Sequence, residues 1–321
     1  MIFEDADQLD LQVAHALQLD GRAPFSRIAA VLGVSDHTVA RRYARLRGDG
    51  LLVVRGLPDP VRLGQTQWFV RIDCMPGVSV RLAEALARRE DTSWISLNSG
   101  GTQVVCSLRT SAGQEDDLLL RLLPNAPRVT SVTAHYAMHT FLGNTQGLLN
   151  KTGALTDEQV EALTPAVQQS DVDGVVTLDD GDRVLLAALA EDGRAGFAAL
   201  AAATGWSQTT VRRRLSDLQA SGVLYFDVDY EWAIVGPHVR TMLWLSVAPD
   251  RLAEVGSAFA RHPQAAYVAA TTGPTNLYAS IVSPSGEAFY RYLTTDVAAL
   301  PGIGQIEAAP VIRTVKTTGR L

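Results

Sequence analysis

The chain has 321 residues, of which 47% are hydrophobic and 19% charged, and its formal net charge is −6. This length allows two or more domains with their own cores, and these proportions are typical of a globular protein with little disorder. The negative net charge argues against a protein that coats nucleic acid without specificity, but it leaves room for local basic patches.

Membrane and redox signals are weak in this sequence. No apolar run approaches the ~20 residues of a membrane span, and the acidic N-terminus is unlike a signal peptide. Cys74 and Cys106 lie far apart and lack CxxC spacing. These features predict a cytoplasmic protein with buried free thiols and no membrane partner.

Residues 1–60 have the pattern of a helix-turn-helix domain. A first amphipathic helix is expected over Asp7–Leu19, and Ser26–Leu52 continues as helix, turn and helix, with Gly33 ending one helix and Ser35 capping the next. The second of these helices buries one apolar face and presents a polar, basic one, as a DNA recognition helix requires. The candidate DNA-binding residues are Ser35, His37, Thr38, Arg41, Arg42 and Arg45.

The domain is expected to end in a small wing. Leu51–Val54 predicts a strand, and Asp59-Pro60 turns the chain after it. The alternative is an ordinary helical hairpin with a solvated basic face, because short motifs of this kind match many unrelated sequences.

Residues 65–142 predict a ferredoxin-like βαββαβ domain. Its strands and helices are expected, in order, over Gln67–Cys74, Val80–Arg89, Ser93–Leu97, Val104–Leu108, Glu115–Leu123 and Val129–Phe141. A polar, acidic linker follows at residues 143–178, with a capped helix over Asp157–Leu163 and a flexible loop over Ser170–Gly174. The sequence suggests no role for this linker beyond tethering.

The whole pattern then repeats. A shift of 172 positions carries Asp20-Gly21-Arg22-Ala23 onto Asp192-Gly193-Arg194-Ala195 without a gap through the helix-turn-helix region. It predicts a second winged helix-turn-helix domain at residues 179–232 and, after one inserted residue, a second βαββαβ domain at 238–318. The expected fold is therefore α+β, two winged helix-turn-helix domains alternating with two ferredoxin-like βαββαβ domains. The candidate DNA-binding residues of the second helix-turn-helix domain are Ser207, Thr210, Arg212, Arg213 and Arg214.

Two details of the repeat shape the expectations. The exposed pairs Arg41/Arg42 and Arg213/Arg214 are retained although packing would not require them, which favours a DNA-binding function. In the last strand Pro310 would be tolerable at a sheet edge, where the fourth strand of this topology lies.

The two copies are not equivalent in charge. Arg45 becomes Asp217, and the first wing carries Arg55 whereas the second carries Asp227 and Asp229. Carboxylates facing phosphates would repel them. The first copy is therefore expected to dominate DNA binding, with the second binding weakly or contacting a different half-site.

This arrangement resembles a tandem-duplicated member of the Lrp/AsnC family of transcription regulators. The residues that carry the resemblance are Leu17, Leu32-Gly33-Val34-Ser35, Val39, Arg42, Leu46, Gly50-Leu51-Leu52, Leu63-Gly64, Thr272-Gly273-Pro274-Thr275-Asn276-Leu277, Leu300-Pro301-Gly302-Ile303 and Val315-Lys316. The resemblance implies a sequence-specific regulator that binds double-stranded DNA and responds to an amino acid or similar small molecule. It implies no enzyme activity, catalytic residue, metal or cofactor.

The family's effector-linked turn has the form Gly-x-x-Asp, and this chain departs from it twice. The aspartate positions hold Gln103 after Gly100 and Asn276 after Gly273. Both replacements are neutral, so either the ligand differs or these are structural turns only.

Three questions stay open at this point. The two βαββαβ domains could pair within one chain as a pseudo-dimer, or chains could form homo-oligomers. Some proteins of this architecture resemble sirohaem decarboxylases, for which His135 and His139 are the candidate ligands here, although strand histidines are more often surface or interface residues. A small-molecule sensor with degenerate helix-turn-helix units is the third alternative.

Overall fold

A computed structural model of the chain describes residues 7–111, 116–165, 174–236 and 238–318. The chain divides into two compact units, each assembled from both halves of the sequence. The helical unit comprises Met1–Gly64 and Asn144–Gly236, and the sheet unit comprises Gln65–Gly143 and Pro237–Leu321. Each unit therefore joins the two domains of one kind. None of the described helices is long and apolar enough to cross a membrane.

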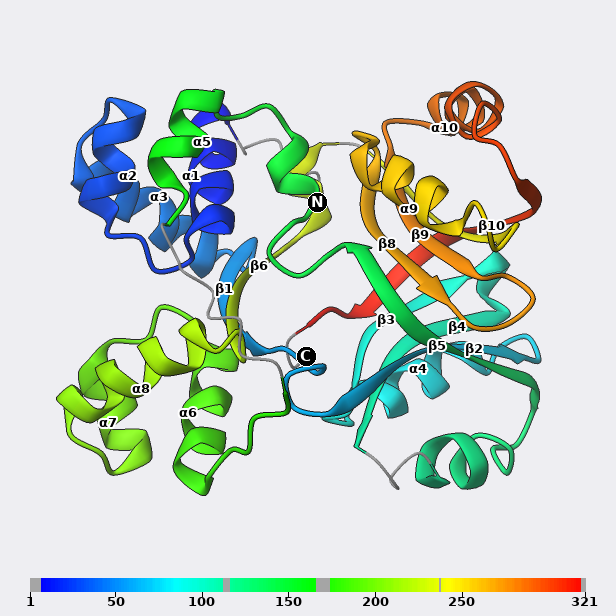
Figure 1. Cartoon of the computed structure of the whole chain (residues 1–321), viewed down its shortest axis with the longest axis horizontal. Coiled ribbons are helices and arrows are strands. Elements are labelled where there is room, and N and C mark those ends of the chain that lie inside the picture. The colour runs from blue at the N-terminus through cyan, green and yellow to red at the C-terminus, as the bar shows by residue number, and fades with distance from the viewer. Residues whose placement is uncertain (1–6, 112–115, 166–173, 237, 319–321) are drawn as a thin grey trace. The chain divides into compact units, whose positions relative to one another are not determined.

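The helical unit contains both helix-turn-helix copies on either side of a two-stranded ribbon (Figure 1). The first copy contributes α1 (Gln8–Leu19), α2 (Phe25–Leu32), α3 (Asp36–Gly48) and β1 (Leu52–Pro58). The second contributes α6 (Asp180–Glu191), α7 (Phe197–Thr204), α8 (Gln208–Ala220), β6 (Leu224–Tyr230) and the short turn η4 (Trp232–Val235). The linker contributes η3 (Leu148–Lys151) and α5 (Asp157–Leu163).

Local signals set the ends of these helices. Gly33 adopts φ +69° at the end of α2, a left-handed conformation that glycine tolerates best, and Gly205 repeats it with φ +74° after α7. The Ser35 hydroxyl accepts a hydrogen bond from the Thr38 amide at the start of α3, and Ser207 does the same for Thr210 at α8. The predicted helix-ending glycine and N-capping serine are therefore confirmed in both copies.

One apolar core serves both copies. The stripe Val39, Tyr43 and Leu46 on α3 is buried, and its counterparts on α8 enter the same cluster. Those counterparts are Val211, Leu215 and Leu218. Burying each stripe against a shared core stabilises helices that are too short to persist alone.

The strand after each helix-turn-helix does not fold back into a wing of its own. β1 pairs antiparallel with β6 of the other copy, from Leu52 opposite Tyr230 to Pro58 opposite Leu224. Arg55 lies opposite Asp227, which is its own counterpart under the 172-residue shift. The ribbon is therefore pseudo-symmetric about this pair, and the expected wings are replaced by one ribbon between the copies.

A reciprocal arginine clamp reinforces the ribbon. Arg22 donates hydrogen bonds to the carbonyl oxygens of Gly193 (2.6 Å) and Ala195 (3.0 Å). Arg194 donates in return to Gly21 (2.7 Å) and Ala23 (3.0 Å). The guanidinium groups also lie over rings of the opposite copy, Arg22 over Phe197 and Arg194 over Phe25. The repeated Asp-Gly-Arg-Ala segment is thus the contact between the copies.

The linker is part of the helical unit, contrary to the expectation that it only tethers. Arg27 of α2 donates to the carbonyl of Ala162 at 2.7 Å, and Gln159 of α5 donates to the carbonyl of Val31 at 3.2 Å. Leu163 is fully buried in the shared core. The first copy therefore carries a fourth helix. Most of the expected loop over Ser170–Gly174 lies outside the described residues.

The sheet unit contains two βαββαβ copies whose helices cover the outside of the sheets (Figure 1). The first consists of β2 (Gln65–Cys74), α4 (Ser79–Ala87), β3 (Thr92–Asn98), η1 (Ser99–Gly101), β4 (Gln103–Ser111), η2 (Asp116–Leu122) and β5 (Val129–Leu142). The second consists of β7 (Val239–Val247), α9 (Leu252–Arg261), β8 (Ala265–Thr271), β9 (Leu277–Ser283), α10 (Gly286–Tyr292), η5 (Leu293–Val297) and β10 (Ile303–Lys316).

One expected helix differs in form. The segment η2 is π-helical rather than α-helical, and Glu115, the first residue of the expected helix, lies outside the described residues.

The eight strands close into one barrel in the order β10-β3-β4-β2-β5-β8-β9-β7. Closure depends on an exchange, because β5 pairs with β8 of the other copy and β10 pairs with β3. The last strand is therefore not an edge, which corrects the expectation for Pro310. β10 pairs with β7 up to Pro310 and with β3 from Val311, so proline lies where the strand changes partners.

We predict that Arg22→Ala lowers the free energy of unfolding of the helical unit by about 2–3 kcal/mol, because it leaves the Gly193 and Ala195 carbonyls without their charged donor. Urea unfolding followed by circular dichroism measures the change. Arg183→Ala is the matched control, since the Arg183–Asp180 ion pair is exposed and should cost less than about 0.5 kcal/mol. An equal loss of unfolding free energy in the two variants would show that the arginine clamp does not stabilise the helical unit.

Candidate nucleic-acid interface and effector turns

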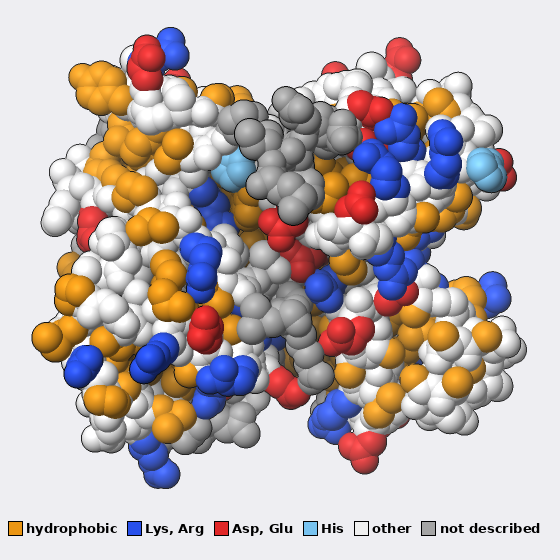
Figure 2. All heavy atoms as spheres, turned by 180° about the vertical axis from the view of Figure 1, so that it is seen from behind, with side chains coloured by type: hydrophobic (Ala, Val, Ile, Leu, Met, Phe, Trp, Pro, Cys, Tyr) orange, Lys and Arg blue, Asp and Glu red, His pale blue; other side chains and the backbone are white. Residues whose placement is uncertain are grey.

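The two helices expected to contact DNA, α3 and α8, present their polar faces to solvent. Ser35, His37 and Arg41 are exposed, and so are Ser207, Arg212 and Arg213. The capping hydroxyls also bond the threonine hydroxyls of the same turn, Ser35 to Thr38 at 2.8 Å and Ser207 to Thr210 at 2.9 Å. Figure 2 shows basic and acidic side chains close together over the first copy of the helical unit.

Two of the arginines expected to contact DNA are engaged within the fold. Arg42 pairs with Asp10 at 3.3 Å and with Asp7 at 2.5 Å, and Arg45 also pairs with Asp10, whose side chain is fully buried. A carboxylate removed from water needs such partners. Arg42 and Arg45 therefore dock α3 onto α1.

The second copy repeats this contact at Arg214. Its guanidinium holds the buried Asp182 carboxylate through two bonds of 2.6 Å each, and this keeps the pKa of Asp182 below its usual value. The retention of Arg42 and Arg214 thus has a packing reason, which corrects the argument that packing does not require them. The signal was available in the sequence, because the 172-residue shift also carries Asp10 onto Asp182.

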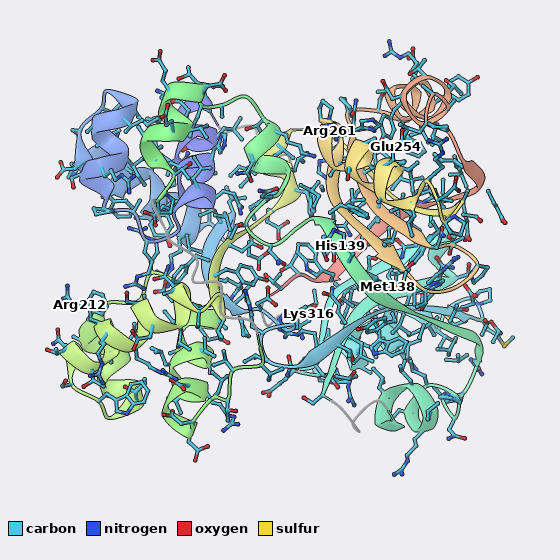
Figure 3. The ribbon with its side chains drawn as sticks, in the orientation of Figure 1. Met138, His139, Arg212, Glu254, Arg261 and Lys316 are labelled. Atoms are coloured by element: carbon cyan, nitrogen blue, oxygen red, sulfur yellow. The ribbon has the colours of Figure 1, made fainter. Side chains whose placement is uncertain are left out.

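Of the arginines expected to contact DNA, Arg41, Arg212 and Arg213 remain exposed. Arg41 and Arg213 are equivalent under the repeat, whereas Arg212 replaces Ala40. Arg212, labelled in Figure 3, lies over the Phe197 ring of α7 with its guanidinium carbon 4.4 Å from the ring centroid. This contact orients the guanidinium while leaving it exposed.

The acidic residues of the second strand contact the first copy. Asp229 pairs with Arg55 across the ribbon at 2.9 Å, and Arg55 also donates to the Ala190 carbonyl at 2.7 Å. Asp227 accepts a hydrogen bond from Gln18 at 2.9 Å. The expected electrostatic difference between two wings is therefore wrong, because these charges belong to the contact between copies.

Asp227 has an unusual titration. Its pKa is raised to about 7, mainly by removal from water and to a smaller extent by the neighbouring Asp229 charge, while hydrogen bonds from Gln18 and the Val228 amide oppose the rise.

The two candidate effector turns hold their side chains in structural contacts. Asn276 exchanges two hydrogen bonds of 2.8 Å with the backbone of Val247 at the end of β7. The amide nitrogen of Gln103 donates to Asp73 at 2.9 Å. Gly100 has φ +72° and Gly273 φ +106°, so both need glycine's conformational freedom.

His135 and His139 lie in different environments on β5. The buried His135 bonds the carbonyl of Thr272 through Nδ1 at 2.8 Å and packs on the Trp244 ring, and burial lowers its pKa. His139 is exposed and lies against Phe141. Among the described residues, no group of three or more His, Cys, Asp or Glu side chains could hold a metal ion.

The barrel interior holds features that sequence patterns did not reveal. Arg71 of β2 pairs with Glu307 of β10 and lies over Trp244 of β7, so the two copies share one ion pair there. The Trp244 indole nitrogen and the second nitrogen of His135 are buried and lack a hydrogen-bond partner among the described residues. The pairing was invisible in the sequence because it depends on the strand exchange.

Known domains match three parts of the chain. The AsnC-type helix-turn-helix domain matches residues 7–47 and 178–219, and the Lrp/AsnC ligand binding domain matches residues 241–321. The chain belongs to the Lrp/AsnC family. Residues 65–142 have the same βαββαβ order of elements as the matched second copy.

Lrp/AsnC relatives match about half of this chain at a time. The HTH-type transcriptional regulator FL11 of Pyrococcus horikoshii is 26% identical over 147 residues, 46% of this chain and 97% of its own length. The regulator LrpA of the same organism is 21% identical over 140 residues, 43% of this chain and 99% of its own length. Each relative is thus as long as one copy, as duplication requires.

A solved structure matches both copies together. The sirohaem decarboxylase NirDL covers 97% of this chain with a TM-score of 0.67, and 93% of that protein is covered at 16% identity. At this identity the similarity establishes the shared tandem fold alone.

We predict that Asp227→Asn changes the pH dependence of stability. A carboxyl group whose pKa is raised by folding stabilises the fold below pH 4, and this contribution is lost as pH rises through about 7. The amide keeps the acceptor for Gln18, so the variant should match the parent near pH 4 and exceed it by about 1–2 kcal/mol at pH 8. Thermal unfolding at both pH values measures this. Asp229→Asn, which removes the ion pair with Arg55, should instead make the protein less stable than the parent at pH 8.

We predict that Asn276→Asp destabilises the sheet unit by about 1–2 kcal/mol, because a carboxylate keeps the acceptor for the Val247 amide but cannot donate to its carbonyl. Chemical unfolding without added ligand measures this loss. Asn125→Asp is the control, since the Asn125 amide donates to the Arg121 carbonyl at an exposed site. An unchanged Asn276→Asp protein would mean that this turn is not structural.

Proposed function

We propose that this Lrp/AsnC chain is a sequence-specific transcription regulator that binds double-stranded DNA through both α3 and α8. The observation that carries the proposal is the pseudo-symmetric helical unit, in which each recognition helix exposes an equivalent arginine, Arg41 or Arg213. Exposed guanidinium groups on such helices can bond guanine edges in the major groove or the flanking phosphates.

The barrel supports a second part of the proposal, a small-molecule effector. The match of residues 241–321 to the ligand binding domain favours it. Because Asn276 is neutral and its side chain is held by Val247, this turn offers no carboxylate for the ammonium group of an amino acid. An amino acid-like effector would therefore bind through other groups.

Sirohaem decarboxylation is the second candidate, and the NirDL fold similarity is its specific support. The two histidines weaken it, because the buried His135 is bonded to Thr272 and the exposed His139 lies in a separate environment. Addition of an iron tetrapyrrole with spectroscopic titration tests it. A Soret shift that saturates at one equivalent and disappears in His135→Ala would favour the enzyme over the regulator.

We predict that Arg41→Ala and Arg213→Ala each weaken specific DNA binding about five- to tenfold and reduce the salt slope of log K by about 1, without changing thermal stability. Titration of labelled duplex by fluorescence anisotropy across salt concentrations measures both. The duplex would carry the region upstream of the chain's own gene.

Two controls make this test specific. Arg183→Ala removes an exposed arginine of α6 and should leave affinity unchanged. Arg42→Ala should lower stability, because it unpairs the buried Asp10. Absence of binding above random DNA at low salt would contradict the proposed function.

A further inference from the structure

The two recognition helices expose different side chains at equivalent positions. Beside the shared arginines Arg41 and Arg213, the first helix has His37 and Ala40 where the second has Thr209 and Arg212. In the next turn the counterpart of Arg45, which pairs with the buried Asp10, is the exposed Asp217. The two copies therefore offer different donors and charges to DNA.

The contact between the copies favours an unlike pair. At the pseudo-symmetry axis of the ribbon, Arg55 lies opposite Asp227, which occupies the equivalent position in the other copy. Pairing of two first copies would place Arg55 opposite Arg55 and would remove Asp229, with which Arg55 pairs at 2.9 Å, and pairing of two second copies would leave Asp229 without Arg55. Like charges directly opposite on paired strands are destabilising, more so when partly removed from water.

Neighbouring groups reinforce this preference. Gln18 donates to Asp227 at 2.9 Å, whereas its counterpart Ala190 offers a backbone carbonyl that accepts from Arg55 at 2.7 Å. On one side of the axis the Asp227 carboxyl group therefore has a hydrogen-bond donor, and on the other side the Arg55 guanidinium has an acceptor. If two first copies paired, each Gln18 amide donor would lie against an arginine, which is also a donor. If two second copies paired, each Ala190 carbonyl would lie against a carboxylate, which is also an acceptor.

Homodimeric helix-turn-helix proteins bind palindromes because two identical helices are related by a two-fold axis. Here that axis relates unlike helices. We infer that the chain binds a non-palindromic DNA site, with half-site A for α3 and a different half-site B for α8, and so lies on DNA in one orientation. This inference rests on the DNA-binding function proposed above. Arg212, held over Phe197, determines specificity in half-site B, where it can donate hydrogen bonds to a guanine. Ala40, the equivalent residue of α3, cannot make this contact in half-site A.

The first experiment selects binding duplexes from a random library with the full chain at moderate salt. The expected consensus has two unlike halves, and the A–B duplex binds at least about tenfold tighter than A–A or B–B duplexes built from it. A palindromic consensus, a single half-site, or equal affinity for A–A and A–B would overturn the inference while leaving the proposed function intact. No enrichment over random DNA would overturn the proposed function itself.

Helix conversion tests the residues responsible. The combined variant Thr209→His and Arg212→Ala gives α8 the side chains of α3 at two exposed positions, where substitution should leave thermal stability nearly unchanged. It should prefer the A–A palindrome over A–B, and Arg212→Ala alone should lose base preference only within half-site B. Retained preference of the double variant for A–B would contradict the assignment of α8 to half-site B.

Orientation can be measured directly. Glu158 lies exposed on α5, a helix that only the first copy carries among the described residues, and Cys74 and Cys106 are buried. A DNA-cleaving iron chelate attached to Glu158→Cys should cut on the A side of the site alone. Equal cutting on both sides would show that the chain binds in either direction.

Discussion

The ribbon between β1 and β6, with the Arg22 and Arg194 clamp around it, is the contact on which the helical unit depends. Each guanidinium satisfies two carbonyl oxygens of the opposite Asp-Gly-Arg-Ala turn. The turn approaches closely because Gly193 has no side chain, and a β-carbon there would lie 2.8 Å from the backbone carbonyl carbon of Arg55. Two helix-turn-helix copies that are 172 residues apart thereby share one core and one pseudo-symmetry axis.

In the sheet unit, the two copies are joined by an exchange of strands. A βαββαβ sheet alone leaves edge strands with unpaired backbone groups. Here β5 and β10 each pair with the second strand of the opposite copy, and the barrel closes without an edge. A duplicated chain carries both complementary edges itself, so the strand pairing between the copies occurs within one molecule.

Repetition of a residue does not by itself identify its role. Arg41 and Arg42 recur together, yet Arg42 holds the buried Asp10 and Arg41 is exposed. The same distinction applies at the Gly-x-x-Asn turn, where Asn276 is held by Val247. Only the neighbours of each side chain separate a residue that maintains the fold from one available to a ligand.

Local sequence patterns specify the left-handed Gly33, the Ser35 cap, the buried stripe of α3 and the order of the strands. These features depend on residues within a few positions of one another, so their signals are readable along the chain. Tertiary structure alone decided that β1 pairs with β6, that Pro310 lies inside a closed barrel, and that Asp227 and Asp229 face the other copy. Those outcomes join residues far apart in the sequence, and they depend on burial and charge pairing that no local pattern records.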